Sequence, residues 1–483
     1  MKSKKFFIFI FIIFFLNTLY TEILDADLEV FKNMIQNRMF DDVIIIVEDA
    51  IKQNPNYTKI DELYYLCAEA YYGLDKYELA LKNYLIIIEN YPTTKLLDKV
   101  LYKIGEVNFR LKKDDETIKY LKEFLKKFPD NELSNRAYYF LGETLIRKTR
   151  YKEAIVFLEA LANKYDDELY FNANYSMGWA YLSLGEYEKA INYYKRIEGK
   201  KDFEDVNIQI GECYLKLNDL EKAEKYFLKI PANSSDYINA LYSLSAIYLK
   251  QKKEGKVEQI INELNDKYTN DYLTLAANFD YANYLYESEK YEQSLKYFEA
   301  VNNMRIKNIN EEIASIYETA NYFTGYIYQI LFLRNKENKN NFNNAERNYK
   351  KYLENYKSGK YRERALFRLG EIYAENNDIE NSIRYYNQVQ DKNLLDKALF
   401  EIARQLYLQN KKDEGIKYLV RLIKETPESK LIIETYFLIA EYYFEKKDYS
   451  NSINYYDELI KVGKNKNSFY EDALYKKGWA LSE

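Results

Sequence analysis

The stretch GWAYLSLGEYEKA, residues 178–190, contains the pattern that decides the fold of this chain. It places a small residue at Gly178, a large aromatic residue three positions later at Tyr181, and a second small residue at Ala190. A short polar turn, residues 184–187, separates the two small positions. This is the arrangement expected of two helices that approach closely at the small residues and are joined by a tight turn.

Both small positions recur along nearly the whole chain. The first is occupied by Ala68, Gly105, Gly142, Gly178, Gly211, Ser245, Ala282, Gly325, Gly370, Ala403, Ala440 and Gly478. The second recurs at intervals of 33 to 37 residues, with one interval of 51, at Val43, Ala80, Thr117, Ala154, Ala190, Ala223, Val257, Ser294, Ala345, Ser382, Gly415 and Ser452. Such a period, with apolar residues at helical spacing inside it, indicates paired helices that stack into a solenoid. Gly inside a helix costs about 1 kcal/mol relative to Ala, so its repeated use at one position indicates close helix packing.

Few residues interrupt the predicted helices, since the 483 residues include only 14 Gly and 5 Pro. Four of the prolines lie twelve residues after the second small position, at Pro55, Pro92, Pro129 and Pro427. Because Pro is common just beyond the end of a helix, we expect the second helix of each pair to end there.

The composition argues against several classes of function. A net charge of −5 argues against nucleic acid as the main partner. The chain has no His, which removes His-dependent catalytic triads and His-ligated zinc. Cys67 and Cys213 lie several repeats apart, so we expect both to be free and buried rather than joined in a disulfide. No phosphate-binding loop or other catalytic motif is present, and we predict no enzyme activity, no cofactor and no metal site.

The first 21 residues have the features of a targeting segment. Lys2, Lys4 and Lys5 precede an unbroken apolar run over residues 6–16. That run suits the core of a signal peptide and is too short to span a bilayer. No Ala-x-Ala cleavage site follows, so an uncleaved N-terminal anchor is the alternative to a removed signal. We therefore expect an exported protein of the cell envelope or periplasm, with membrane contact only through this segment if it is retained.

The chain resembles the tetratricopeptide repeat family from about residue 24 to residue 483. Residues 178–190 and 136–154, the latter with Gly142 and Ala154 at the two small positions, match the family pattern. The resemblance implies an α-solenoid of about twelve helix pairs that forms a right-handed superhelix and binds other proteins. Longer units that end in Tyr91-Pro92 or Phe128-Pro129 resemble the envelope subgroup, which includes outer-membrane assembly lipoproteins and Tol-Pal-associated periplasmic proteins. The chain departs from the lipoproteins because no Cys follows the apolar run.

One irregularity divides the repeats. Gly325 precedes Ala345 by 20 residues instead of 12, and the polar residues 334–341 lie between them. We expect these residues to form an exposed, mobile loop. We place a boundary near residue 305, which gives an N-terminal array of residues 22–304 and a C-terminal array of residues 305–483. The last predicted helix contains Trp479, and the given sequence ends there in the middle of a repeat.

A row of aromatic residues is the candidate binding surface. Three residues before the first small position the chain has Tyr65, Tyr102, Tyr139, Tyr175, Ile208, Tyr242, Phe279, Tyr322, Phe367, Phe400, Phe437 and Tyr475. In the tetratricopeptide repeat family this helix face tends to line the concave groove. We expect a groove that binds an amphipathic or basic peptide segment; the alternative is that the aromatic rings pack consecutive first helices together.

Carboxylates lie on the same helix face, four residues from the aromatic row. They are Glu69, Glu106, Glu143, Glu212, Glu371 and Glu441. Glu106, Glu143 and Glu212 each precede a basic residue by four positions, which allows an intrahelical ion pair. Like charges instead follow Glu371 and Glu441, at Glu375 and Glu445, so we predict that these four contact the partner.

A basic stretch over residues 347–368 could meet an acidic partner or lipid headgroups, or could be a solvated helix face. It includes Arg362, Arg364 and Arg368. From all these features we predict an exported, non-enzymatic scaffold that mediates protein–protein interactions in the bacterial cell envelope. The alternative is the helical N-terminal region of a larger envelope enzyme whose catalytic domain lies outside this chain.

Overall fold

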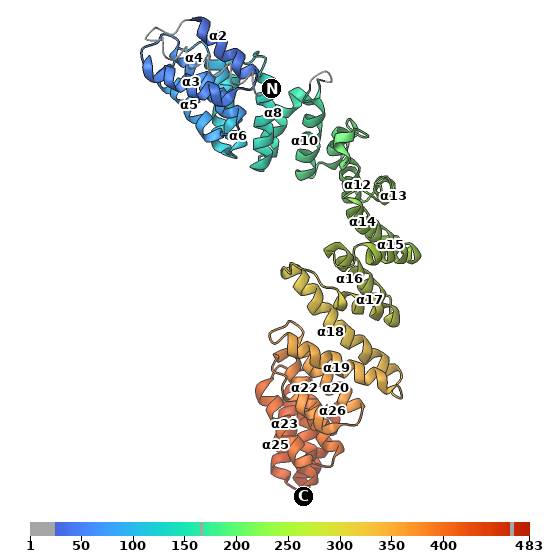
Figure 1. Cartoon of the computed structure of the whole chain (residues 1–483). Helices are drawn as coiled ribbons and strands as arrows, with labels where there is room; N and C mark the ends of the chain where they lie inside the picture. The colour runs from blue at the N-terminus through green and yellow to red at the C-terminus, as the bar shows by residue number, and fades with distance from the viewer. Residues whose placement is uncertain (1–24, 165–167, 464–467) are drawn as a thin grey trace. The chain divides into compact units, whose positions relative to one another are not determined.

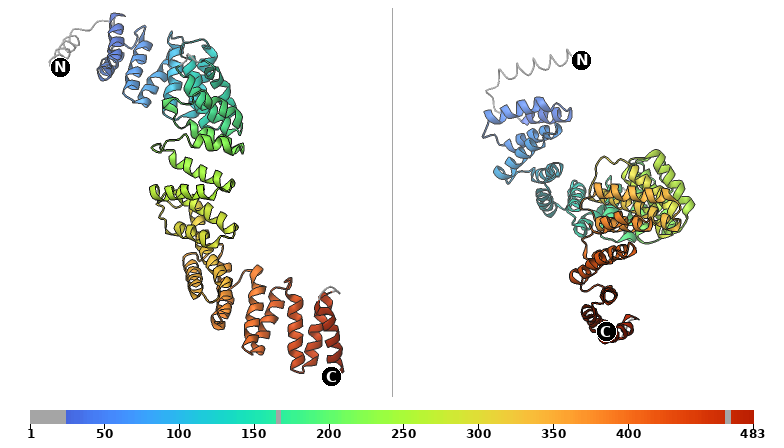
Figure 2. Two further views of the ribbon diagram at one scale, coloured as in Figure 1. Left: turned by 90° about the vertical axis from the view of Figure 1, so that its right-hand side faces the viewer. Right: turned by 90° about the horizontal axis from the view of Figure 1, so that it is seen from below.

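The computed structural model describes residues 25–164, 168–463 and 468–483, and these residues are all-helical (Figure 1). They form 25 α-helices and no β-strand, and within each of two compact units consecutive helices pack against each other (Figure 2). Twelve helix pairs, from α2–α3 to α24–α25, are followed by α26. The prediction of an all-α array of about twelve helix pairs is therefore confirmed.

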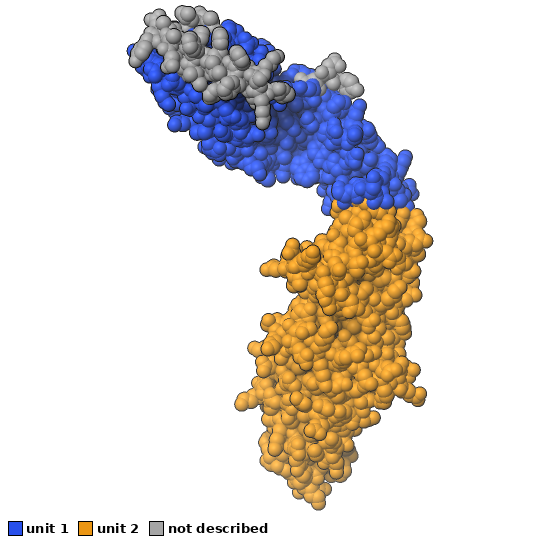
Figure 3. All heavy atoms as spheres, in the orientation of Figure 1, with its two compact units in different colours: residues 1–236 blue, residues 237–483 orange. Residues whose placement is uncertain are grey.

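The chain divides into two compact units, which Figure 3 colours separately. Unit 1 ends at Asp236. Its helices are α2 (Asp25–Gln36), α3 (Phe40–Gln53), α4 (Ile60–Gly73), α5 (Tyr77–Asn90), α6 (Leu97–Arg110), α7 (Asp114–Lys127), α8 (Ser134–Arg147), α9 (Tyr151–Ala162), α10 (Tyr170–Ser183), α11 (Tyr187–Lys195), the short 3-10 helix η1 (Lys201–Phe203), α12 (Val206–Lys216) and α13 (Leu220–Phe227).

Unit 2 begins at Tyr237. Its helices are α14 (Tyr237–Lys250), α15 (Glu254–Lys267), α16 (Tyr272–Glu287), α17 (Tyr291–Asn303), α18 (Glu311–Arg334), α19 (Lys339–Asn355), α20 (Arg362–Glu375), α21 (Ile379–Tyr386), α22 (Lys392–Leu408), α23 (Lys412–Glu425), α24 (Ile432–Glu445), α25 (Tyr449–Gly463) and α26 (Ser468–Ser482). In every pair after α2–α3 the first helix carries the first small position, and the second helix carries the second.

The boundary predicted between residues 304 and 305 lies inside unit 2, between α17 and α18. These two helices pack against each other, so the interval of 51 residues does not coincide with a division of the stack. The predicted targeting segment, residues 1–21, lies outside the described residues.

A single left-handed residue makes the turn inside nearly every pair. Eleven of the twelve pairs have one residue of positive φ between their helices: Arg38, Asp75, Lys112, Thr149, Gly185, Asn218, Lys252, Glu289, Asn377, Asn410 and Lys447. In α8–α9, for example, Thr149 has φ 58° and the Arg150 amide donates to the Leu145 carbonyl at 2.8 Å. Such a turn satisfies the last carbonyls of the first helix and reverses the chain within a few residues.

The small positions bring the paired helices together, as the sequence predicts. A Cβ atom on Gly178 would lie 2.5 Å from a ring carbon of Tyr194, which is fully buried in α11. Gly142 meets Leu158 in the same way, also at 2.5 Å. Because no side chain fits at these points, Gly at the first small position and a large residue four positions after the second form one interlocking contact.

The opposite end of several pairs is tied to the next pair by a polar contact. The hydroxyl of Thr94 donates to Asp61 at 2.5 Å, and Asn131 donates to Asp98 at 2.8 Å. Ser429 and Asp396 repeat this contact in unit 2 at 2.6 Å. In each case the donor lies two residues after a proline of the predicted helix end, and it also caps a backbone amide of the next turn.

The prediction of a mobile loop over residues 334–341 is wrong. Helix α18 continues to Arg334, and α19 begins at Lys339, so only four residues connect them. The two helices are 24 and 17 residues long, whereas α6 and α7 have 14 residues each. The added turns fold because they carry apolar side chains. Phe332 is fully buried, and its ring centroid lies 5.5 Å from that of Phe342.

Cys67 and Cys213 are free and buried, which confirms that prediction. Among the described helices, none combines the length and the apolar character needed to cross a bilayer. The described residues also contain no group of three or more His, Cys, Asp or Glu placed to hold a metal ion.

Candidate functional site

The predicted aromatic row lies in the seam between the two helices of each pair. Tyr102, Ile208, Tyr322 and Phe367 are buried, and Tyr475 is exposed. The others are half-buried: Tyr65, Tyr139, Tyr175, Tyr242, Phe279, Phe400 and Phe437. Most contact the ring four residues after the second small position, with centroid distances of 5.8 Å for Tyr65–Tyr84, 5.9 Å for Tyr175–Tyr194, 6.1 Å for Phe279–Phe298, 6.0 Å for Tyr322–Tyr349, 5.2 Å for Phe367–Tyr386 and 6.2 Å for Phe437–Tyr456. The regular spacing of the row therefore has a structural cause, which is packing of the first helix on the second helix of its own pair.

Part of the row also lines a groove in unit 2. The groove has a volume of about 750 Å³, and its walls come mainly from α18, α20 and α22. Five of the predicted site residues line it: Tyr322, Phe367, Phe400, Glu371 and Glu375. Aromatic residues that the sequence analysis did not single out complete the wall: Tyr286, Phe323, Tyr326 and Tyr386.

The carboxylates of the groove are paired with cations of unit 2. Glu371 accepts from Arg368 at 2.7 Å and from the Gln329 side-chain amide at 3.0 Å. Glu375 pairs with Lys336 at 2.5 Å. A third carboxylate of the groove, Glu401, pairs with Arg404 at 2.6 Å.

Burial opposes the charge of Arg368, but attraction to Glu371 outweighs it, and the pKa of Arg368 is raised. The guanidinium of Arg368 also lies 4.9 Å from the ring centroid of Tyr326, a cation–π contact that holds it at the groove wall. Arg368 therefore stays charged, and its charge is directed to Glu371.

The other two predicted carboxylates lie away from this groove and are also paired. Glu441 accepts from the Tyr456 hydroxyl and from Lys476. Glu445 pairs with Lys412 at 2.6 Å. The like charges that follow Glu371 and Glu441 in sequence are thus offset by cations from other helices, which the spacing along one helix does not reveal.

Two cations of the groove have a different environment. Arg364 and Lys397 line it, are exposed, and make no ion pair with the described residues. Arg364 was part of the basic stretch noted in the sequence, and Lys397 occupies the same repeat position one unit later. That shared position, six residues before Gly370 and six before Ala403, is the signal that could have identified Lys397.

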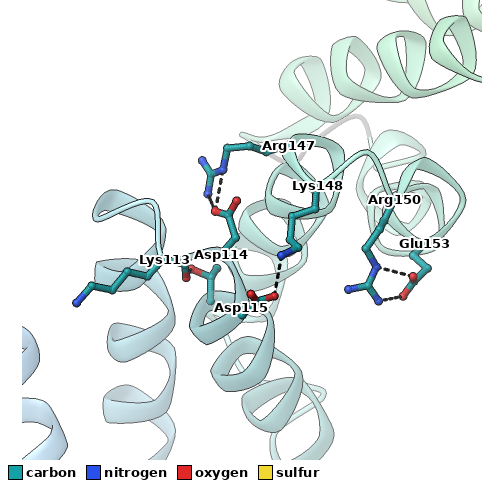
Figure 4. A network of polar contacts seen from close by, with 8 residues as sticks. Lys113, Asp114, Asp115, Arg147, Lys148, Arg150 and Glu153 are labelled. Atoms are coloured by element: carbon teal, nitrogen blue, oxygen red, sulfur yellow. Dashed lines mark hydrogen bonds and ion pairs between the residues drawn. The ribbon is translucent and has the colours of Figure 1, made fainter.

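In unit 1, neighbouring pairs are tied by ion pairs at the corner between helices (Figure 4). Arg147 pairs with Asp114 at 2.5 Å and Lys148 with Asp115 at 2.8 Å, so α8 is tied to the start of α7. The sequence allowed Arg147 to pair with Glu143 on its own helix, but its guanidinium lies on Asp114 instead.

Glu143 accepts from the Ser176 hydroxyl of the next pair. Burial raises the pKa of the Glu143 carboxyl, while Ser176 and Arg147 act in the opposite direction. Glu106 likewise pairs with Lys103 at 3.1 Å rather than with the basic residue four positions later. The carboxylates on this face of unit 1 therefore contribute to contacts inside the stack.

Comparison with known protein families gives matches to one kind of repeat. Sequence models described as "Tetratricopeptide repeat" match residues 62–94, 99–131, 136–163, 181–244, 363–391, 397–429 and 433–463, together slightly more than half of the chain. Among curated proteins, none matches the chain.

Several solved structures are similar to parts of the chain. The crystal structure of MamA is 27% identical, covers 34% of this chain and 91% of its own, and has a TM-score of 0.30. A tetratricopeptide repeat protein from Parabacteroides merdae is 17% identical, with coverages of 53% and 92% and a TM-score of 0.37. The C-terminal part of a repeat-containing protein from Cytophaga hutchinsonii is 15% identical, with coverages of 60% and 98% and a TM-score of 0.38. From its repeating sequence, its paired helices and the matches to these sequence models, the chain belongs to the tetratricopeptide repeat family.

Proposed function

We propose that this protein is an exported, non-enzymatic scaffold of the bacterial cell envelope that binds a segment of another protein in the groove of unit 2. The groove carries this proposal. Aromatic side chains of α18, α20 and α22 line it, together with charged and polar groups of the same helices. A concave surface that combines aromatic rings with fixed charges is the kind of surface that recognises a peptide segment.

The proposal of a protein partner is tested by site-specific photocrosslinking in intact cells. A benzoylphenylalanine residue replaces Leu333, which lines the groove and is 41% exposed. The matched control replaces Leu408, which is 69% exposed and lies outside the groove. We expect crosslinks to a defined protein from position 333 and not from position 408. Equal crosslinking from both positions, or none from position 333, would contradict the proposal.

Export is tested separately, on residues 1–21 fused to alkaline phosphatase, an enzyme that is active only after export. The three lysines and the apolar run support the proposal that this segment directs export. We expect activity from the natural segment and its loss in Ile12→Asp, which interrupts the apolar run. An inactive natural fusion would remove the envelope location while leaving the groove proposal open to its own test.

A further inference from the structure

We propose that the partner segment bound by the groove of unit 2 is acidic and amphipathic, with its carboxylates paired to Arg364 and Lys397. The inference rests on the proposed function, because it names the chemistry of the ligand in the same groove. It replaces the expectation of a basic ligand, which was drawn from the carboxylates alone.

The first support is the internal pairing of the groove carboxylates. Glu371, Glu375 and Glu401 each have a cation of unit 2 within 2.7 Å. The Arg368–Glu371 pair is only 33% and 28% exposed on its two side chains, so solvent screens it incompletely. A basic ligand would have to displace an arginine or lysine that is already in place, which offsets most of what it would gain.

The second support is the state of the remaining cations. Arg364 and Lys397 have no carboxylate partner in the described chain, and both side chains are exposed at the groove. The charge of Arg364 reaches into the groove wall. Burial raises the pKa of the Tyr322 phenol, and Arg368 and Arg364 act in the opposite direction. The groove therefore offers an incoming segment the uncompensated positive charge of Arg364 and Lys397.

The spacing of the two cations constrains the ligand. They occupy equivalent positions on α20 and α22, which are neighbouring first helices in contact. Packed helix axes lie about 8–10 Å apart. An extended chain rises about 3.3 Å per residue. Two acidic side chains about three residues apart along an extended segment would therefore match the two cations.

Aromatic side chains line the same groove as these two charges. Phe367 and Phe400, one on each of the two helices, both line the groove. Phe400 is half-buried, and its exposed edge can receive an apolar side chain of the ligand. A segment with two acidic side chains about three residues apart and large apolar side chains between or beside them would satisfy both features, which is why the ligand is expected to be amphipathic as well as acidic.

The experiment is selection of random twelve-residue peptides, displayed on phage, against the purified full-length protein. Selected peptides are measured by fluorescence anisotropy against three forms of the protein: the natural chain, Arg364→Glu/Lys397→Glu, and the control Lys351→Glu/Lys424→Glu. The control changes the net charge equally, at two exposed residues of α19 and α23 outside the groove. All substitutions are at exposed positions, and an unchanged melting temperature establishes that each variant is folded.

We expect the selected peptides to contain Asp or Glu together with aromatic or aliphatic residues. The groove variant should bind them about 10- to 100-fold more weakly, because both proposed ion pairs become contacts between like charges. The control should bind them with little change. Peptides that depend on the groove but are neutral or basic would overturn this inference and leave the proposed function standing. Failure to select any peptide that competes for the groove would overturn both.

Discussion

The helix pairs α10–α11 and α18–α19 use the same two small positions and are packed differently. A Cβ on Gly178 would lie 2.5 Å from the ring of Tyr194, whereas one on Gly325 would lie 3.0 Å from the ring of Tyr349. The Tyr194 hydroxyl is buried without a hydrogen-bond partner among the described residues, whereas that of Tyr349 donates to Gln329 at 2.7 Å. Gln329 in turn lines the groove and holds Glu371. The same repeat pattern thus gives an apolar, closed contact in one pair and a polar connection to a binding surface in the other.

The largest effect is expected from removing the ring that anchors the added turn of α18. Phe332→Ala should lower the free energy of unfolding of unit 2 by about 3–5 kcal/mol, because it leaves a cavity beside Phe342. Urea unfolding followed by circular dichroism measures the change. Amide hydrogen exchange then locates it in α18 and α19, since neighbouring pairs can open independently in a repeat array.

Leu333→Ala is the matched control for this substitution. Leu333 follows Phe332 directly and is 41% exposed, so its loss should cost less than about 1 kcal/mol. If both substitutions have equally small effects, residues 334–341 and the helix ends beside them behave as the mobile loop that the sequence suggested.

A smaller difference should appear when Ala replaces the glycine of each pair. Gly178→Ala should lower stability by about 2 kcal/mol, because the added Cβ overlaps a fully buried ring in a well-packed contact. Gly325→Ala should change it by less than about 1 kcal/mol, since the looser contact and the better helix propensity of Ala nearly offset each other. Chemical denaturation of the two variants side by side tests the ranking, and the reverse order would show that helix length does not loosen the pair.

Replacing each partner tyrosine by phenylalanine sharpens the comparison further. Tyr349→Phe should cost about 1–2 kcal/mol, because the buried Gln329 oxygen loses its donor. Tyr194→Phe should be neutral within about 0.5 kcal/mol or slightly stabilising, since its hydroxyl is buried without a partner. Thermal unfolding of both single variants is sufficient, and an equal loss in both would mean that the Tyr194 hydroxyl is bonded in solution.

The smallest effect concerns the turn that the regular pairs have and α18–α19 lacks. Thr149 is a β-branched residue at φ 58°, whereas the equivalent residue of α10–α11 is Gly185 at φ 76°. Thr149→Gly should raise stability by about 0.5–1 kcal/mol, because Gly adopts this conformation without strain. The reciprocal Gly185→Thr should lower it, and a loss of stability in Thr149→Gly would argue that another contact of Thr149 matters more.

The fold could be predicted because its determinants are local and repeated. The small residues at the two repeating positions each indicate one contact between the helices of a pair, and this pattern recurs along nearly the whole chain. The prediction was wrong where composition was given more weight than helical spacing. Residues 334–341 are polar, yet Phe332 and Phe342 on either side continue the apolar faces of their helices, and these faces extend both helices toward each other.

The candidate site was predicted only in part, since it depends on contacts between helices. Tyr322, Phe367 and Phe400 were placed on the correct face by spacing within one helix. Spacing within one helix does not show whether a charged side chain is paired with a residue of another helix. Glu375 is paired by Lys336, 39 residues earlier in the chain, so a single-helix reading treated it as free for a ligand. Arg364 and Lys397 differ from the other cations of the groove because no carboxylate of the described residues pairs with them.

The lengthened corner of α18–α19 also bears on how such proteins diverge. A helix completes one turn in about 3.6 residues, so an insertion of about four residues on each side of a corner returns every apolar side chain to its former face. An insertion of two residues would instead rotate that face by about 200°. Insertions that survive selection at these corners should therefore come in whole turns. Each inserted turn would then lengthen the surface available to a partner by one step, while the packing contacts between the helices are kept.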